Sequence, residues 1–193
     1  MLLVLLSPLF ITISVLIKLD SRGKLIYKRR VLGLNKKPFY LLKFRTMDSD
    51  ADEILSEWEN TSIDLYNNYH ENLKLDNDPR ITSLGKFLRK SSLDELPQLV
   101  NVLYGEMSLI GPRPLTNIMG LDERSRYTKK HLKVRFSVMP GITGMWQVYG
   151  RQVIAYSERE KLDQYYIDNA SIALDLRIFL KTPLVVIKGR GAF

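Results

Sequence analysis

The sequence has no cysteine and only two histidines, His70 and His131, in 193 residues. The absence of cysteine excludes disulfide bonds, thiolate nucleophiles and zinc sites built on thiolates. With two histidines, a serine-histidine-acid triad or a multi-histidine metal site has little material. Carboxylates and cationic side chains are plentiful by contrast, because Asp and Glu number 21 and Lys and Arg number 29. This composition favours chemistry that combines carboxylates, arginines and a hard metal ion.

Charge is distributed unevenly along the chain. Residues 18–45 contain ten basic residues and one acidic residue, whereas residues 48–78 contain ten acidic residues and one basic residue. The formal net charge of +8 is typical of proteins that bind nucleic acid, an anionic membrane surface or a phosphorylated small molecule. The acidic stretch and the lack of a nucleic-acid-reading motif argue against the first class. A membrane-tethered nucleic-acid binder stays as a competing hypothesis, but we expect no nucleic-acid partner.

The N-terminal residues 2–17 form an uncharged apolar run. As a helix the run spans about 24 Å, which is short of the ~30 Å hydrocarbon core of a bilayer. Pro8 within it removes a helical hydrogen bond and predicts a break or bend, which the hydroxyl of Ser7 can help to repair in lipid. A secretory signal peptide is the alternative, but no basic residue precedes the run. The basic residues that follow favour the cytoplasmic face and anionic lipid headgroups.

The remaining sequence alternates short apolar segments with turn residues. Strands are expected at 25–27 and 39–44, joined by a turn at 33–38 into a hairpin. Elsewhere apolar residues recur at helical spacing, with helices expected at residues 51–75, 84–88, 94–103 and 157–188, the last interrupted near Pro183. The acidic segment at about 48–78 is interpreted as a solvated helical insertion. The sequence therefore predicts a helix-rich α/β fold with a small β-hairpin.

Asp94 and Glu95 are adjacent acids near the expected start of a helix. Pro97 is tolerated only in a first turn, so regular helix cannot extend far upstream of Asp94. One interpretation is structural, because first-turn acids favour the helix macrodipole and Ser92 with Glu95 fits a capping box. The other is chemical, because neighbouring carboxylates bind Mg²⁺ while one of them attacks a phosphoryl group. Position alone does not choose between them.

Two later segments can present arginine to an anion. In Gly-Pro-Arg-Pro at 111–114, two prolines restrict the backbone around Arg113, whose guanidinium matches phosphate oxygens. A surface turn is the alternative. Residues 139–151 combine glycines, Trp146 and a terminal Arg151, and exposed backbone amides there can approach phosphates. The segment lacks the ending of a P-loop, so it gives weak evidence for a nucleotide.

Taken together, these segments resemble the bacterial sugar transferases known as monotopic phosphoglycosyl transferases. The matching segments are KFRTM at 43–47, DPRIT at 78–82, LRKSSLDELPQL at 88–99, GEMSLIGPRP at 105–114 and PGITG at 140–144. The match continues in shorter pieces almost to the end of the chain. The segment at 147–151 and the C-terminal residues 188–193 resemble the branch that transfers galactose or glucose 1-phosphate.

The resemblance implies a membrane enzyme that moves a sugar 1-phosphate from a UDP-sugar to a polyprenyl phosphate, usually undecaprenyl phosphate, with release of UMP. It implies that Asp94 is the nucleophile, which forms an aspartyl phosphosugar intermediate, and that Glu95 is its partner in a Mg²⁺-dependent dyad. It also implies that Arg89, Arg113 and Arg151 bind the substrate phosphates. The product would start capsule, O-antigen or exopolysaccharide assembly.

The resemblance also predicts how the chain meets the membrane. Residues 1–18 are expected to form a re-entrant helix broken at Ser7 and Pro8, and residues 19–193 a catalytic domain with surface amphipathic helices. The domain is expected on the cytoplasmic face of the bacterial inner membrane. Only six residues precede Ser7, fewer than in the family, so a truncated first arm is an alternative. An inactive scaffold that recruits assembly partners is the third functional hypothesis.

Overall fold

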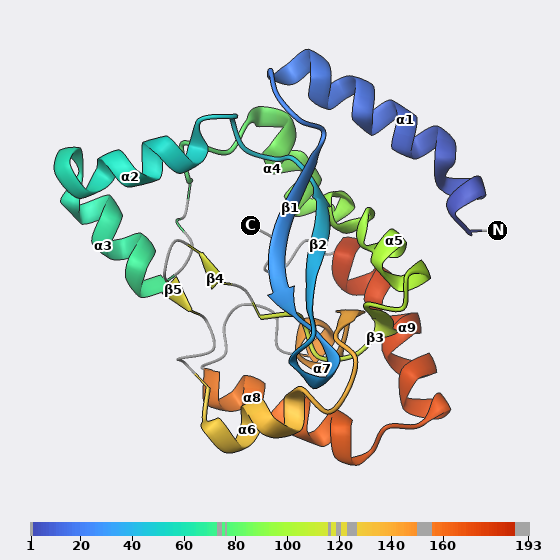
Figure 1. Cartoon of the computed structure of the whole chain (residues 1–193). Helices are drawn as coiled ribbons and strands as arrows, with labels where there is room; N and C mark the ends of the chain where they lie inside the picture. The colour runs from blue at the N-terminus through green and yellow to red at the C-terminus, as the bar shows by residue number, and fades with distance from the viewer. Residues whose placement is uncertain are drawn as a thin grey trace. The chain divides into compact units, whose positions relative to one another are not determined.

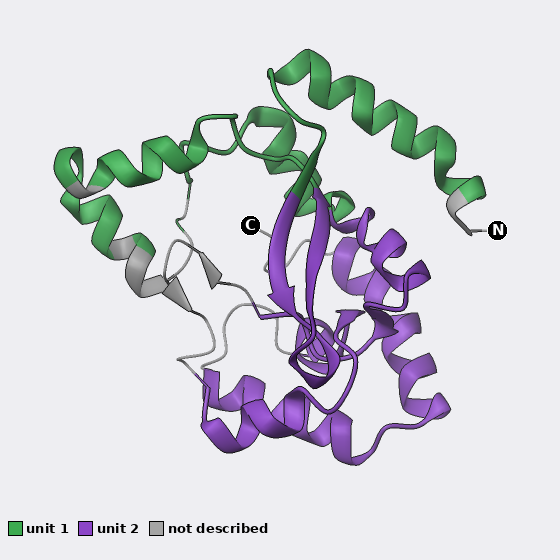
Figure 2. Ribbon diagram, viewed as in Figure 1, with its two compact units in different colours: residues 1–27, 44–94, 193 green, residues 28–43, 95–192 purple. Residues whose placement is uncertain are grey.

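In the computed structural model the chain forms two compact units, and each unit consists of separate stretches of the sequence (Figure 2). Unit 1 contains residues up to 27 and residues 44–94, and unit 2 contains residues 28–43 and those from 95 onward, apart from the last. The boundary therefore passes between Asp94 and Glu95. The structure describes residues 2–72, 75, 77–115, 117–118, 121–122, 127–149 and 156–187.

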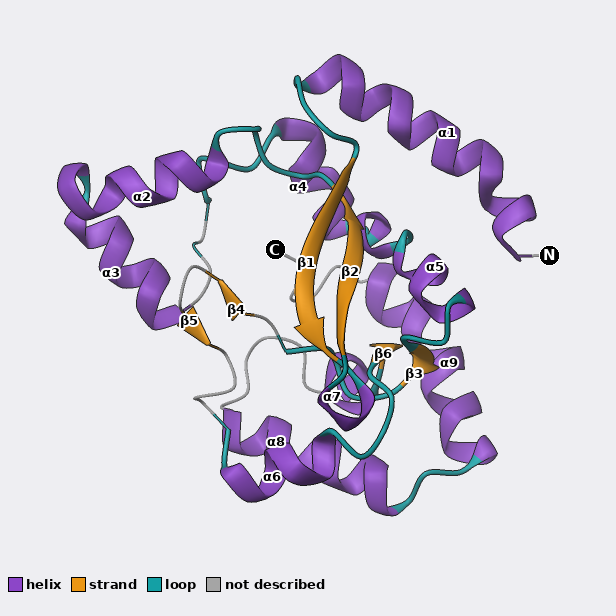
Figure 3. Cartoon of the chain, viewed as in Figure 1, coloured by secondary structure: helices purple, strands orange, loops and turns teal. Residues whose placement is uncertain are grey.

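A β-hairpin is the longest strand pairing among the described residues. β1 (Ile26–Leu32) and β2 (Pro38–Phe44) form a two-stranded sheet, joined through a short 3-10 helix, Leu34–Lys36 (Figures 1 and 3). Asn35 and Lys36 have positive φ angles of 53° and 61°, which reverse the chain. The predicted hairpin is confirmed. β1 continues beyond the predicted strand through the basic residues Lys28, Arg29 and Arg30 to the buried Val31.

Unit 1 packs a long N-terminal helix against a short one. α1 (Leu2–Asp20) contacts α4 (Ser83–Lys90), and the buried side chains include Ile17, Phe44 and Leu88. α4 begins where the N-cap hydroxyl of Thr82 accepts a hydrogen bond from the amide of Gly85 at 2.9 Å. A Cβ at Gly85 would lie 2.0 Å from the carbonyl oxygen of Thr46, so only glycine permits this close approach.

The helix α1 continues through Pro8, so the predicted break does not end it in this structure. The lost hydrogen bond is the one that a residue-8 amide would donate to the carbonyl of Val4. The hydroxyl of Ser7 donates to that carbonyl at 2.7 Å and replaces the missing donor. Among the described residues, no helix combines the length and apolarity needed to cross a bilayer. The re-entrant course of residues 1–18 stays a prediction.

The acidic segment forms two helices, α2 (Ala51–Thr61) and α3 (Ile63–Asn72), as the sequence predicts. Its outer face is solvated, but Trp58 and Tyr69 are buried. The guanidinium carbon of Arg80 lies 4.7 Å from the ring centroid of each, and its nitrogens donate to the carboxylate of Asp78 at 2.9 and 2.6 Å. Arg80 therefore holds the segment in place through cation–π contacts with both rings and a buried ion pair with Asp78.

Unit 2 is built on short strands and five helices among its described residues. Besides most of the hairpin, it contains the strands β3 (Ser108–Ile110), β4 (Asn117–Ile118), β5 (Leu121–Asp122) and β6 (Gly141–Thr143). Its helices are α5 (Gln98–Leu103), α6 (Lys129–Arg135), α7 (Met145–Tyr149), α8 (Tyr156–Asp168) and α9 (Ile172–Ile187). β3 pairs with β6 in parallel, with Ser108 opposite Gly141, and β4 with β5 antiparallel. A core of Met145, Tyr166, Leu174 and Ile178 joins α7, α8 and α9.

The last helical region is interrupted earlier than the sequence predicts. α9 continues through Pro183 to Ile187, and the gap lies between α8 and α9. The hydroxyl of Ser171 accepts from the amide of Leu174 at 3.3 Å, so a side-chain cap starts α9 there. One face of α9 buries Leu174 and Ile178. Its exposed residues include the apolar Ile172, Leu176, Phe179, Leu180, Leu184 and Ile187, so α9 presents apolar side chains to solvent as well as to the core.

Candidate active site

Asp94 and Glu95 lie in a short 3-10 helix, Leu93–Glu95, and not in the first turn of α5. Pro97 is the N-cap of α5, which starts at Gln98. Ser92 has a φ of 56°, which turns the chain sharply between α4 and the two acids. Ser92 therefore does not cap α5, because that helix begins beyond both acids.

The carboxylate of Asp94 is buried in unit 1, where the residue is only 7% exposed. Arg89, in the last turn of α4, lies in its field. Burial lowers the pKa of the Arg89 guanidinium, and the attraction of Asp94 is the largest influence in the opposite direction. The Nε of Arg89 donates to the hydroxyl of Thr46 at 2.8 Å, and this hydrogen bond orients the Arg89 guanidinium. Asp94 and Arg89 are thus an electrostatically coupled pair in a largely buried setting.

The carboxylate of Glu95 meets different cations, which belong to unit 2. Its Oε1 lies 2.7 Å from the Nζ of Lys43 on β2, and 3.9 Å from a terminal nitrogen of Arg113. The side chain of Glu95 is 23% exposed, and that of Arg113 is 42% exposed. Lys43 thus holds one carboxylate oxygen in place, while the side chain of Arg113 is partly exposed to solvent.

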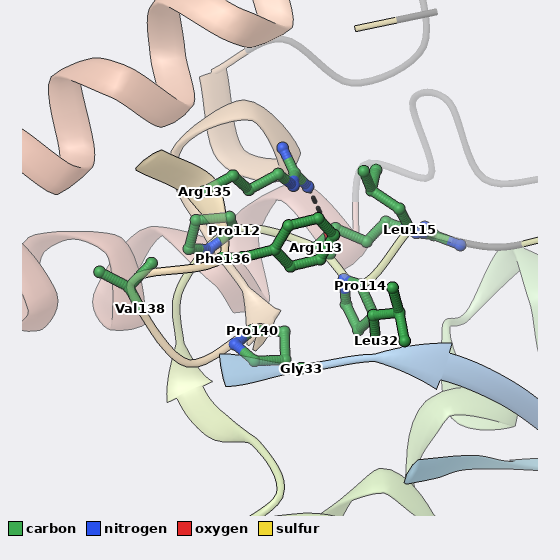
Figure 4. A pocket seen from close by; sticks show the side chains of 10 residues that line it. All are labelled: Leu32, Gly33, Pro112, Arg113, Pro114, Leu115, Arg135, Phe136, Val138 and Pro140. Atoms are coloured by element: carbon green, nitrogen blue, oxygen red, sulfur yellow. Dashed lines mark hydrogen bonds between the residues drawn. The ribbon is translucent and has the colours of Figure 1, made fainter. Parts of the chain in front are cut away.

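The segment that carries Arg113 is built tightly into unit 2. The amide of Gly111 donates to Thr143 O, and the amide of Gly141 donates to Pro112 O, each at 2.9 Å. A Cβ at Gly111 would lie 2.6 Å from the carbonyl oxygen of Met139, so the two backbones can approach only at glycine. Figure 4 shows Arg113 between its two prolines, beside the side chains of Arg135 and Phe136 that line a small pocket. The proline turn is therefore a braced loop, not a free surface turn.

The predicted site residues fall into three groups. Arg89 accompanies Asp94 in unit 1, and Arg113 accompanies Glu95 in unit 2. Arg151 lies outside the described residues. The sequence analysis gave Lys43 no role, although this residue starts the matched segment 43–47 and lies near the end of β2. Membership of that matched segment is the signal that could have found it.

The donor set suits a magnesium ion shared with substrate. Among residues the structure describes, no cluster of three or more acids and histidines forms a complete metal cage. Mg²⁺ prefers oxygen ligands and is commonly held by one or two carboxylates together with substrate phosphates. Asp94 and Glu95 supply two carboxylates of the kind that such a site uses.

Comparison with known proteins gives long matches. The family model described as bacterial sugar transferase matches residues 1–189. The exopolysaccharide production protein ExoY of Rhizobium meliloti is 42% identical over 194 residues, which cover 99% of this chain and 82% of that protein. The undecaprenyl-phosphate galactose phosphotransferase of Salmonella typhimurium is 40% identical over 193 residues, 100% of this chain and 39% of its own length.

A further relative carries a glucose-specific name. The UDP-glucose:undecaprenyl-phosphate glucose-1-phosphate transferase of Klebsiella pneumoniae is 35% identical over 196 residues, 98% of this chain and 37% of that protein. The chain thus spans less than two fifths of the two relatives named as phosphate transferases, but most of ExoY. The family match extends over nearly the whole chain, and the segments that define the site all lie within it. The chain is a member of the bacterial sugar transferase family.

Proposed function

We propose that this chain transfers a hexose 1-phosphate from a UDP-sugar to undecaprenyl phosphate and releases UMP. The observation that carries the proposal is the buried carboxylate of Asp94 in the field of Arg89, followed at once by Glu95 bound to Lys43. The names of the Salmonella and Klebsiella relatives support galactose or glucose as the sugar. The product would initiate the assembly of exopolysaccharide, capsule or O-antigen.

The proposed reaction proceeds in two displacements at one phosphorus. First, an oxygen of Asp94 forms a bond to the sugar-linked phosphorus of the donor, and the bond to the bridging oxygen breaks with its electron pair leaving on UMP. Then a phosphate oxygen of undecaprenyl phosphate forms a bond to the same phosphorus, and the Asp94–phosphorus bond breaks. The carboxylate is restored. The two-step scheme lets one site serve a water-soluble donor and a lipid acceptor in turn.

The cationic side chains have distinct parts in this scheme. An anionic nucleophile approaches an anionic phosphoryl group, so the charge between them must be neutralised. We assign this task to Arg89, Arg113 and Arg151. Lys43 holds Glu95 in one position. Mg²⁺, held by Asp94, Glu95 and substrate phosphates, would supply further neutralisation.

Association with a membrane surface is the second part of the proposal. Within unit 2, α9 exposes an apolar face whose residues recur every three or four positions. Within unit 1, α1 exposes apolar side chains that include Val4, Leu5 and Leu19. We propose that such faces hold the enzyme at the cytoplasmic face of the bacterial inner membrane, with residues 1–18 re-entrant and basic residues near anionic lipids.

The membrane proposal is tested by sedimentation with vesicles that contain anionic phospholipid. Replacing Leu176 and Leu180 together by serine is expected to lower the bound fraction, because both exposed side chains lie on the apolar face of α9. Replacing the exposed Leu65 of α3 by serine is the matched control. Equal binding by all three proteins would contradict the part assigned to α9.

The enzymatic proposal is tested with a panel of UDP-sugars and undecaprenyl phosphate. The expected result is UMP release with UDP-galactose or UDP-glucose, lost when EDTA removes the divalent ion. The variant Asp168→Asn changes an exposed acid of α8 and is expected to retain full activity. An absence of UMP release with every sugar would overturn the proposed function.

A further inference from the structure

Arg135 is a buried arginine whose guanidinium connects two parts of unit 2. It ends α6 and is only 4% exposed. One terminal nitrogen donates to the carboxylate of Asp163 on α8, and the other donates to the main-chain carbonyl of Arg113. Figure 4 shows the second of these hydrogen bonds reaching the Arg113 loop from beside the pocket. The same side chain therefore contacts a buried acid and the backbone of a candidate phosphate-binding residue.

Stability alone is a weak explanation for this pair. Asp163 is 1% exposed, and removing two charges from water costs several kcal/mol per ion, which their attraction often only offsets. Such a pair also needs hydrogen bonds for the remaining donors of the guanidinium. Here one of those bonds goes to a loop carbonyl instead of a second side chain. The distinctive feature of this pair is that Arg135 also donates to the main-chain carbonyl oxygen of Arg113.

Neighbouring rings restrict the guanidinium further. Its central carbon lies 5.2 Å from the ring centroid of Tyr127, and Tyr127 stacks on His131 with ring centroids 5.5 Å apart. The Tyr127 ring against the guanidinium and the hydrogen bond to the Asp163 carboxylate together restrict the orientation of the guanidinium. The donor aimed at the Arg113 carbonyl is therefore held in a fixed direction.

The loop that receives this hydrogen bond is braced at consecutive carbonyls. Pro112 O accepts from the amide of Gly141, and Arg113 O is the next acceptor along the chain. The side chain of Arg113 extends from this point to Glu95, with a nitrogen 3.9 Å from a carboxylate oxygen. Fixing the backbone on both sides of the Cα limits where an exposed guanidinium can reach.

We infer that Arg135 and Asp163 are positioning residues, which hold the Arg113 loop so that the Arg113 guanidinium meets the diphosphate of the sugar donor. The inference rests on the proposed function, because it names the ligand of Arg113. Asp163 fixes one arm of the Arg135 fork, and the other arm fixes the loop. Neither residue needs to touch substrate. A pair that only joins α6 to α8 is the alternative.

The test is a double-mutant cycle on UMP release. Arg135→Lys keeps a cation opposite Asp163 but lacks the fork that serves two acceptors. It is expected to lower kcat/KM for the UDP-sugar by up to about 100-fold, as small displacements of a positioned group can. In an Arg113→Ala background the same substitution is expected to cause almost no further loss, because the group it positions is gone. Lys133→Gln removes an exposed charge from the same helix and is the control, with unchanged activity.

Asp163→Asn is the second variant, used with thermal unfolding to exclude proteins that fail to fold. In the otherwise wild-type protein, Asp163→Asn should lower kcat/KM as Arg135→Lys does. In the Arg113→Ala protein it should cause almost no further loss. Equal fold losses in both backgrounds would overturn the positioning role. Hydrogen exchange over residues 108–115 gives a readout independent of activity, and we expect faster exchange there in Arg135→Lys. A wild-type protein inactive on all UDP-sugars would refute the proposed function, whereas unchanged exchange would refute the inference.

Discussion

Asp94 and Glu95 are consecutive in the chain, yet their carboxylates have different surroundings. Asp94 is nearly enclosed within unit 1, in the field of a buried arginine, whereas Glu95 is partly exposed and bound to Lys43 within unit 2. Two like groups in unlike environments are a common way to divide chemical tasks. The enclosed acid suits attack on phosphorus, and the acid tethered by a lysine suits a fixed ligand for the metal and substrate.

The largest expected effect is the difference in kcat between the two variants in which one of these acids is replaced by its amide. Asp94→Asn removes the nucleophile, and its kcat is expected to fall by about 10⁴-fold or more. Glu95→Gln keeps the nucleophile, so we expect a loss of about 10² to 10³ with the covalent step still detectable. UMP release under saturating donor measures both. Equal losses, each with the intermediate absent, would break the division between the acids.

A smaller effect is expected from the cation that holds Glu95. Lys43→Met leaves that carboxylate without its 2.7 Å partner, and kcat/KM is expected to fall by about tenfold to 100-fold. Lys43→Arg retains the charge and should recover part of the activity. In a Glu95→Gln background the Lys43→Met loss should shrink. If the losses in kcat/KM from Lys43→Met and Glu95→Gln are additive, Lys43 does not act through Glu95.

The turn that precedes both acids offers a test of stability. Ser92 has a φ of 56°. A residue other than glycine in this left-handed conformation lowers the free energy of unfolding by about 1–2 kcal/mol. Ser92→Ala and Ser92→Gly both lose the hydroxyl, so their difference reports the backbone alone. Urea unfolding should show the glycine variant more stable than the alanine variant by about 1 kcal/mol. A more stable alanine variant would argue against a left-handed turn beside the acids.

The smallest effect concerns the pH dependence of stability in unit 2. Burial, with help from Arg135, lowers the pKa of His131. The unfolded chain therefore binds a proton more readily, and this contribution to stability is lost as the pH falls below about 6.5. His131→Gln should flatten the decrease in unfolding free energy between neutral pH and pH 5. An identical decrease in the variant would exclude His131 as its source.

Local patterns predicted much of the fold. The hairpin followed from apolar segments around a turn, and Pro97 limited where α5 could begin. Pro8 does not end α1, and the hydroxyl of Ser7 donates to the carbonyl that lost its amide partner, as the sequence predicted. Pairing of β3 with β6 had no local signal, since the strands are short and far apart in sequence.

The candidate site was predictable where it lies in one segment. Asp94, Glu95 and Arg113 occur in distinctive motifs, whereas the partners that orient them come from distant positions. Lys43 is 52 residues from Glu95, and Arg135 is 22 residues from Arg113. An isolated lysine or arginine gives no sign of which carboxylate or carbonyl it will meet. Such contacts depend on tertiary packing, and the structure supplied them.

We propose that Asp94, and not Glu95, forms the bond to phosphorus. Mass spectrometry of the protein after incubation with UDP-galactose or UDP-glucose and Mg²⁺, without the lipid acceptor, tests this assignment. We expect a hexose-phosphate adduct on the peptide that contains Asp94, absent in Asp94→Asn and discharged when undecaprenyl phosphate is added. Sustained UMP release into the lipid product with no adduct, or an adduct on Glu95, would contradict it.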